Sequence, residues 1–271
     1  MPYLIIRGLD LYYEERGTGR ETIVFSHGLL MNLRMYDAQM KDLSQKYRCI
    51  AYDHPGQGLS DVPDGPMIDM ETCYDDAATL IETIGGGAVH FVGLSMGGFV
   101  GLRLASRRPD LIKTLTLIDT TADAEPSKNI AAYQRMIMVA RTFSPSVLTK
   151  RIMPLLFGDE FLNDPARESE RAFWEHMVGQ NHRSIYKAVN GVIYRPGVAR
   201  ETRLLKVPTL VIHGVDDRAI PRRNAEHLAE LTKGELVLIQ GSGHSPTIEA
   251  PEAVSEALKG FIGAHSAAVS S

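Results

Sequence analysis

Short apolar runs alternate with longer helical patterns along most of this chain, and this alternation restricts the possible fold more than any other feature. The runs are typical of buried strands and read "TIVFSHG", "YRCIAYD", "VHFVGLS", "TLTLID", "PTLVIHG" and "ELVLIQG". Helical patterns lie near residues 32–45, 70–84 and 96–107, and a last one begins at Pro251. Such alternation is typical of a mostly parallel sheet with helices on both faces. We therefore predict an α/β fold.

Two further runs precede these six. "YLII" and "LYYEER" flank Arg7 and Gly8, a hairpin-like turn that predicts an antiparallel pair of strands. Together with the six later runs, the hairpin leads us to expect an eight-stranded, mostly parallel sheet flanked by helices.

The alternation stops between residues 124 and 204. This segment contains three helical patterns but no strand candidate; the patterns read "NIAAYQRMIMVARTF", "RESERAFWEHMVGQ" and "HRSIYKAVNGVIY". Long insertions in compact domains are usually functional. We therefore predict a core domain of residues 1–123 and 205–271, with a helical cap of residues 124–204 inserted after the sixth strand. The alternative is a set of extra helices that only thickens the core.

A G-x-S-x-G pentapeptide, Gly93 to Gly97, lies where a predicted strand ends and a predicted helix begins. A sharp turn there strains its central residue, Ser95, and the flanking glycines leave room for the neighbouring backbone. The hydroxyl would stand at a helix N-terminus, where developing negative charge is favoured. This context predicts a nucleophile. The pattern alone would also suit a serine that caps a helix.

A serine hydroxyl needs a base to take its proton. His244 is the predicted base, because it lies in the glycine-rich loop "IQGSGHSPTIEAPEAV" between the last strand and the last helix. A carboxylate should orient the imidazole, and "VIHGVDDRAIP" offers Asp216 and Asp217. Asp119 and Asp123 follow an earlier strand and are further candidates for the acid.

In these features the chain resembles the α/β-hydrolase superfamily, and within it the capped serine hydrolases. The resemblance extends over essentially the whole chain and rests on "SHGLLMN", "AYDHPGQGLSD", "VGLSMGGFVGLRLA", "HGVDDRAIP" and "GSGHSPTIEAPE". It implies a triad of Ser95, Asp217 and His244, because the family pattern G-x-x-D-x-x-x-P maps its acid onto Asp217. It also implies an oxyanion hole formed by the backbone N–H groups of Leu29 and Met96.

The segment "DHPGQGLS" departs from the common family form, which has arginine at the position of Pro55 and often histidine at that of Gln57. We assign this segment an architectural role and expect Asp53 to support its turn. His27 is expected to be structural and to pack beneath the oxyanion loop.

A serine nucleophile cannot form the aspartyl ester of dehalogenases and epoxide hydrolases. The stretches "SHGLLMNLRMYDAQMKDL" and "FVGLSMGGFVGLRLASRRPDLIKTLTLIDTTA" are similar to 3-oxoadipate enol-lactonases and related lactonases and esterases. This resemblance implies a hydrolase of carboxylic esters or lactones, with enol-lactones and acyl-homoserine lactones as two candidate classes. The alternatives are a carbon–carbon bond hydrolase, a cofactor-free perhydrolase or haloperoxidase, and a receptor-like ligand-binding protein.

The composition argues against several other classes. A net charge of -4 gives no electrostatic case for nucleic acid or an acidic membrane surface. Cys49 and Cys73 form neither metal spacing nor a disulfide framework, which fits a reducing compartment. The start "MPYLIIRGLDLYYEERG" does not resemble a signal peptide. We expect a cytoplasmic enzyme that uses no cofactor or metal and whose partner is a small-molecule ester or lactone.

The predicted cap contains more basic than acidic residues. We interpret Lys128, Arg135, Arg167 and Arg171 as a solvated basic face, since the opposite helix faces carry apolar residues. We expect those apolar residues to line a substrate pocket as well as to pack on the core; they are Ile137, Met138, Phe143, Met153, Phe157, Trp174 and Val178.

Overall fold

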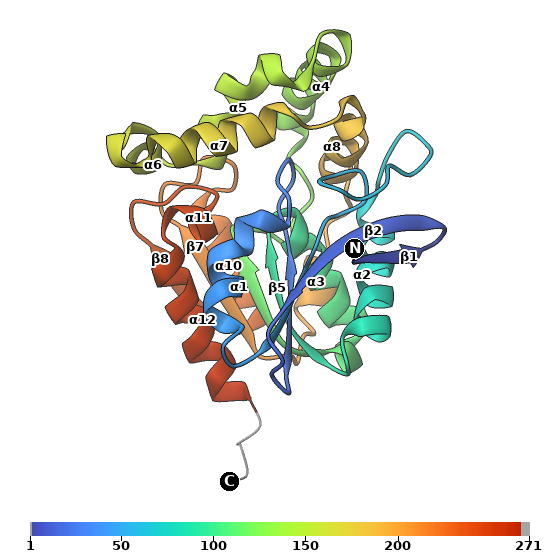
Figure 1. Ribbon diagram of the computed structural model, residues 1–271, viewed down its shortest axis with the longest axis vertical. Coiled ribbons are helices and arrows are strands. Elements are labelled where there is room, and N and C mark those ends of the chain that lie inside the picture. The colour runs from blue at the N-terminus through green and yellow to red at the C-terminus, as the bar shows by residue number, and fades with distance from the viewer. Residues whose placement is uncertain (1, 267–271) are drawn as a thin grey trace.

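Eight strands form one sheet in the computed structural model, which describes residues 2–266 (Figure 1). Their order is β1-β2-β4-β3-β5-β6-β7-β8. Strands β3 to β8 pair in parallel, whereas β1 pairs antiparallel with β2 and β2 antiparallel with β4. The predicted fold class is therefore confirmed. The strands span Tyr3–Ile6 (β1), Leu9–Arg16 (β2), Thr22–Ser26 (β3), Arg48–Tyr52 (β4), Val89–Leu94 (β5), Ile112–Ile118 (β6), Thr209–Gly214 (β7) and Glu235–Ile239 (β8).

The predicted hairpin joins β1 to β2. Arg7 and Gly8 both have positive φ, at 52° and 78°. A two-residue link of this kind matches the right-handed twist of the strands that it connects.

Helices cover both faces of the sheet (Figure 1). Alternate side chains of β3 point to opposite faces, so that Val24 packs in the cluster that includes α2, α3 and α10. Ile23 and Phe25 pack in the other cluster, with α1 and α12. These core helices span Asp37–Leu43 (α1), Met70–Ile84 (α2), Met96–Arg107 (α3), Arg222–Thr232 (α10), Pro246–Glu249 (α11) and Pro251–His265 (α12).

The predicted helices 70–84 and 96–107 have the same bounds in the structure. The prediction of one helix near residues 32–45 is wrong. A 3₁₀ turn at Leu33–Tyr36 comes first, and α1 follows it. The side chain of Asn32 accepts a hydrogen bond from the Arg34 N–H at 3.0 Å, which favours this tighter turn. Other 3₁₀ turns span Pro109–Leu111, Pro145–Leu148, Pro165–Arg167 and Arg183–Ile185.

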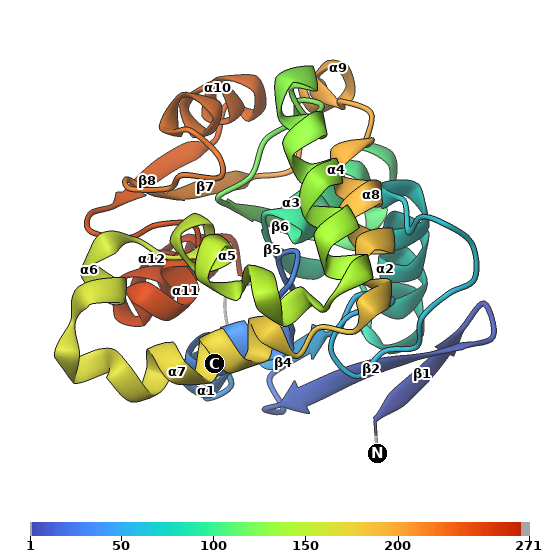
Figure 2. The same cartoon turned by 90° about the horizontal axis from the view of Figure 1, so that it is seen from above.

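Six helices lie between β6 and β7. Of these, α4 to α8 lie over the carboxyl ends of the parallel strands, and Figure 2 views them from above, whereas α9 packs beside α3 and α10. They span Ser127–Thr142 (α4), Thr149–Leu156 (α5), Asp159–Asn163 (α6), Glu168–Gly179 (α7), Tyr186–Ile193 (α8) and Ala199–Thr202 (α9). The three predicted patterns correspond to α4, α7 and α8. The sequence does not predict α6 and α9, which are five and four residues long, or α5, which contains Pro154. The division into core and cap remains a prediction.

The apolar residues of this insertion divide into three groups. Ile137 and Val178 line the cavity described below. Met153, Phe157 and Trp174 pack instead in the same core cluster as α1 and α12. The expectation that all seven line a pocket or pack on the core is wrong for Met138 and Phe143, which are 62% and 63% exposed. Met138 follows the inward-facing Ile137, and neighbours on a helix point in different directions.

The predicted basic face is also partly wrong. Arg167 donates hydrogen bonds to the carbonyl oxygens of Ile248 and Glu249, at 2.7 Å and 2.6 Å, and lies over the ring of Phe161. It therefore attaches the insertion to α11. Among residues 2–266, none of the helices combines the length and the apolar composition that crossing a bilayer requires.

Candidate active site

Ser95 lies between β5 and α3 in a strained backbone conformation, with φ 51° and ψ −109°. A Cβ on Gly93 would overlap the carbonyl oxygen of Gly97, and a Cβ on Gly97 would overlap that of Ser26. The two glycines therefore let the backbone make the sharp turn that the sequence predicts. Ser95 is 8% exposed, and its side chain makes no hydrogen bond within residues 2–266.

Strained backbone is concentrated around this serine. Of the five non-glycine residues with positive φ in the described chain, Leu30, Ser95 and Asp119 follow β3, β5 and β6. The carboxyl ends of these neighbouring strands meet at one edge of the sheet. Strain of this kind costs about 1–3 kcal/mol per residue and tends to persist at functional sites.

The backbone N–H groups of Leu29 and Met96 find no acceptor within residues 2–266. Leu29 lines the same cavity as Ser95, and Met96 begins α3. Gln57 contacts both loops, because its Oε1 accepts from the Leu30 N–H at 2.8 Å and its Nε2 lies 3.5 Å from the Met96 sulfur. The sequence analysis assigned Gln57 only to architecture. No local pattern could show that it joins the two loops.

Asp53 supports the neighbouring turn, as expected. Its Oδ1 accepts from the Leu33 N–H and its Oδ2 from the Leu59 N–H, both at 2.8 Å. Burial raises the pKa of Asp53 to about 6, despite these two hydrogen bonds. His27 is fully buried, and its Nε2 accepts from the His54 N–H at 2.9 Å. Burial lowers the pKa of His27 to about 4, so it is neutral near pH 7 and suits the structural role predicted for it.

His244 and Asp217 form a hydrogen-bonded pair, with 2.7 Å between Nδ1 and Oδ2. The other oxygen of Asp217 accepts from the N–H groups of Ala219 and Ile220, at 2.7 Å and 3.0 Å. Burial opposes a charge on His244, but the adjacent carboxylate more than offsets it and raises the pKa of the imidazole. Burial likewise opposes ionisation of Asp217, yet His244 lowers the pKa of its carboxyl.

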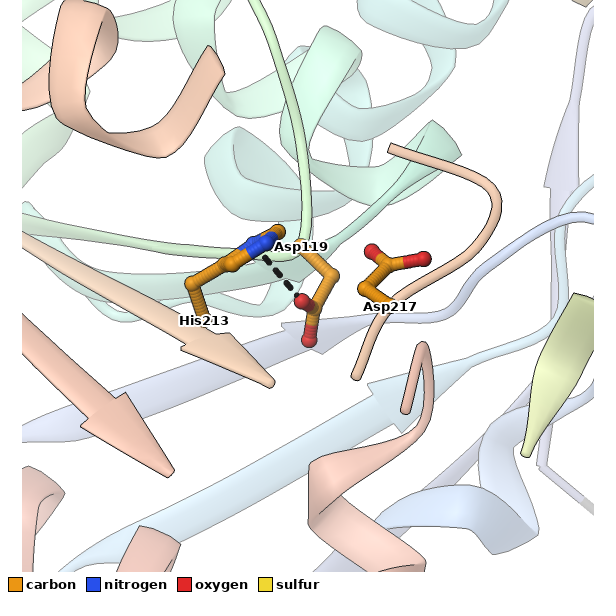
Figure 3. Close-up of side chains that lie close together, drawn as sticks. All are labelled: Asp119, His213 and Asp217. Atoms are coloured by element: carbon orange, nitrogen blue, oxygen red, sulfur yellow. Dashed lines mark ion pairs between the residues drawn. The ribbon is translucent and has the colours of Figure 1, made fainter. Parts of the chain in front are cut away.

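Asp119 lies close to this pair but contacts a different histidine (Figure 3). Its Oδ1 is 2.8 Å from His213 Nδ1 and accepts from the Gly214 N–H at 2.9 Å. Asp119 and His213 are both fully buried. Burial, followed by the charge of Asp217, raises the pKa of Asp119 well above its ordinary value, and burial lowers that of His213. Burial and the charge of Asp217 therefore both oppose a negative charge on Asp119, and Asp217 is the carboxylate that faces His244.

Asp119, His213 and Asp217 each offer one ligand atom, and these atoms lie within 4.8 Å of one another. The sequence predicts no metal site, because its scattered histidines lack ligand spacing such as H-x-x-x-H on one helix face. The group fits a cation poorly. All three residues are at most 9% exposed, and Asp217 already holds His244 and two backbone N–H groups.

Ser95 and His244 line one cavity, with a volume of about 140 Å³, beneath α4, α5 and α8. Most of its wall is aliphatic or aromatic. No hydrogen bond joins Ser95 to His244 in the described residues, although such contacts often tighten only when substrate binds. The same wall contains the ion pair of Arg195 and Glu125, with 3.1 Å between Nη1 and Oε2. Sequence reasoning missed this pair.

In a comparison with known protein families, residues 21–251 match the model of the α/β hydrolase fold family. Among solved structures, the enol-lactonase from Burkholderia xenovorans LB400 is 27% identical with a TM-score of 0.89, over 97% of this chain and 100% of that one. A thermophilic esterase from Thermogutta terrifontis is 28% identical with a TM-score of 0.88, over 97% of both chains. Among curated relatives, the Caulobacter sp. (strain K31) protein named "Putative carbamate hydrolase RutD" is 26% identical over 95% of this chain and 97% of its own.

Proposed function

Since the chain belongs to the α/β-hydrolase fold family, we propose that it is a serine hydrolase that cleaves carboxylic esters or lactones through an acyl-enzyme. The observation that carries this proposal is the strained Ser95, which precedes Met96 and lines the same cavity as Leu29, while the N–H groups of Leu29 and Met96 find no acceptor within residues 2–266. A nucleophile at positive φ beside two free donors suits attack on a carbonyl carbon.

The proposed reaction begins when Ser95 Oγ bonds to the carbonyl carbon and its proton passes to His244 Nε2. The carbonyl electrons move onto oxygen, where the N–H groups of Leu29 and Met96 stabilise the charge. Asp217 holds the proton on Nδ1 of His244, which leaves Nε2 free to accept. The ester C–O bond then breaks, and His244 returns its proton to the leaving alkoxide.

Water repeats the sequence on the acyl-enzyme and frees Ser95 together with a carboxylic acid. In a lactone the alcohol stays attached to the acyl chain, so the product is a single hydroxy acid. An aliphatic cavity beside Ser95 suits an acyl chain and favours esters and lactones over the carbon–carbon bond hydrolase and perhydrolase alternatives. The complete set of triad and oxyanion positions argues against a receptor-like protein.

The test combines labelling with a substrate screen. A fluorophosphonate should label the wild-type protein and leave Ser95→Ala unlabelled. Short acyl esters and lactones should be cleaved. Carbamates are included because a relative is named "Putative carbamate hydrolase RutD", and carbon–carbon cleavage substrates because they represent the alternative reaction. Absence of labelling in the folded wild-type protein would contradict the serine mechanism, and turnover of carbamates alone would contradict the ester assignment.

A further inference from the structure

Arg195 places a buried positive charge in the otherwise apolar wall of the substrate cavity. Its side chain is 3% exposed, and its guanidinium lies 4.0 Å from the ring centroid of Phe99. Nη1 donates to Glu125 Oε2 at 3.1 Å and to the Val192 carbonyl oxygen at 2.7 Å. These contacts fix one edge of the guanidinium in place.

The other edge has no partner. Nε is buried without an acceptor, and Nη2 makes no hydrogen bond within residues 2–266. Buried donors are nearly always paired in folded proteins, because an unpaired donor loses its hydrogen bonds to water without replacement. Because Nε is fully buried, an oxygen atom of a bound substrate would supply an acceptor for Nη2.

Phe99 connects the guanidinium of Arg195 to the nucleophile. The Phe99 N–H donates to the Ser95 carbonyl oxygen at 3.1 Å, so Phe99 lies one turn of α3 beyond the nucleophile. Arg195 stacks on Phe99, and all three residues line the same cavity. An acyl chain that is bound to Ser95 would therefore pass the guanidinium within a few carbons of its carbonyl group.

Charge balance decides which kind of oxygen fits. Glu125 already neutralises Arg195, so the pair contributes no net charge to the cavity. A substrate carboxylate would leave the apolar wall with an uncompensated negative charge, which burial strongly disfavours. A ketone or hydroxyl oxygen accepts a hydrogen bond and leaves the pair neutral.

We propose that Arg195 determines specificity by donating a hydrogen bond to a neutral oxygen on the acyl chain, so that the preferred substrates are oxo- or hydroxyacyl esters and lactones. This inference rests on the proposed ester or lactone hydrolysis and names its substrate class.

The experiment compares four esters of the same chain length: ethyl hexanoate, ethyl 3-oxohexanoate, ethyl 5-oxohexanoate and monoethyl adipate. In the wild-type protein, at least one oxo ester should exceed ethyl hexanoate about tenfold or more in kcat/KM, and monoethyl adipate should fall below it. The paired variant Arg195→Met with Glu125→Gln removes the donor without leaving a buried charge unpaired. It should lose the oxo preference, so that the ratio of kcat/KM on the oxo ester to kcat/KM on ethyl hexanoate falls to about one.

Arg135→Met is the control, because Arg135 is exposed on α4 and lies outside the cavity wall; it should keep the oxo preference. Thermal unfolding and fluorophosphonate labelling verify that each variant is folded with a reactive serine. An oxo preference that survives in the paired variant would overturn the inference, as would a wild-type preference for monoethyl adipate. A wild-type protein that neither reacts with fluorophosphonate nor cleaves any ester contradicts the proposed function itself.

Discussion

The Nδ1 atom of His244 lies 2.7 Å from Oδ2 of Asp217, and this contact decides how both groups titrate. It raises the pKa of the imidazole against the opposing effect of burial and lowers that of the carboxyl. At neutral pH, therefore, a negative Asp217 faces the ring that is proposed to accept the serine proton.

The pH dependence of activity should reflect this pair. Only neutral His244 can act as a base, so kcat/KM on an uncharged ester should rise with pH, with a midpoint above the ordinary value of about 6.5. In Asp217→Asn the midpoint should fall, because burial then acts on His244 with less opposition. Initial rates between pH 5 and 9 measure both midpoints. A flat profile in the wild-type protein would contradict a histidine base.

Loss of the nucleophile or the base should abolish turnover. Ser95→Ala and His244→Ala are expected to lower kcat by up to about 10⁶, because either change ends the acyl-enzyme route. His176→Ala is the matched control, since His176 is exposed on α7 and should tolerate the change. Steady-state kinetics on one good ester, with circular dichroism to verify folding, provides the measurement. More than a small fraction of activity in Ser95→Ala, with contamination excluded, would rule out the mechanism.

The carboxyl groups of Asp217, Asp216 and Asp119 should differ in how much each contributes to kcat. Asp217→Asn should lower kcat by about 10⁴, because the amide favours the wrong tautomer of His244. Asp216→Asn should cost little, since this side chain makes no hydrogen bond in the described residues. Asp119→Asn should also be mild, because Asp119 accepts a hydrogen bond from the Gly214 N–H and an asparagine amide oxygen can accept the same bond. A larger loss from Asp216→Asn or Asp119→Asn than from Asp217→Asn would move the acid to that residue.

The apolar cavity should select for chain length. Each added methylene on an uncharged acyl chain should lower KM about fourfold, corresponding to about 0.8 kcal/mol, until the cavity is full. Because Arg195 is neutralised by Glu125, raising the salt concentration should change kcat/KM only slightly. A KM series over straight-chain esters at two salt concentrations tests both points. Steep loss of efficiency with salt would indicate recognition of an anionic substrate.

Gly58 should be intolerant of a side chain. Its φ is +56°, and a Cβ there would overlap the Asp53 carboxylate that holds the turn. We expect Gly58→Ala to lower the free energy of unfolding by about 2 kcal/mol or more. Gly260→Ala in α12 is the control, because its Cβ would meet no neighbour and a helical alanine should add about 0.5–1 kcal/mol. Urea denaturation measures both changes, and equal effects of the two substitutions would refute the packing argument.

The class of fold and the candidate nucleophile and base could be predicted from local pattern, whereas the choice of Asp217 as the acid rests on the family resemblance. Strand runs, the Gly93–Gly97 turn and the bounds of α2 and α3 depend on residues that are neighbours along the chain, so their spacing predicts them directly. The predictions for the insertion were less accurate. There, the burial of Met138 or Arg167 depends on which distant elements pack against each helix.

The sequence by itself determined which chemical groups the chain carries and where the strand and helix periods place them. Only the tertiary structure decided which of these groups meet. It joined Asp217 to His244 and Asp119 to His213, because strands that lie far apart in the chain end at one edge of the sheet. It also buried Arg195 beside Glu125 in a mostly apolar wall. A donor there cannot bond to water, so leaving it unpaired costs free energy.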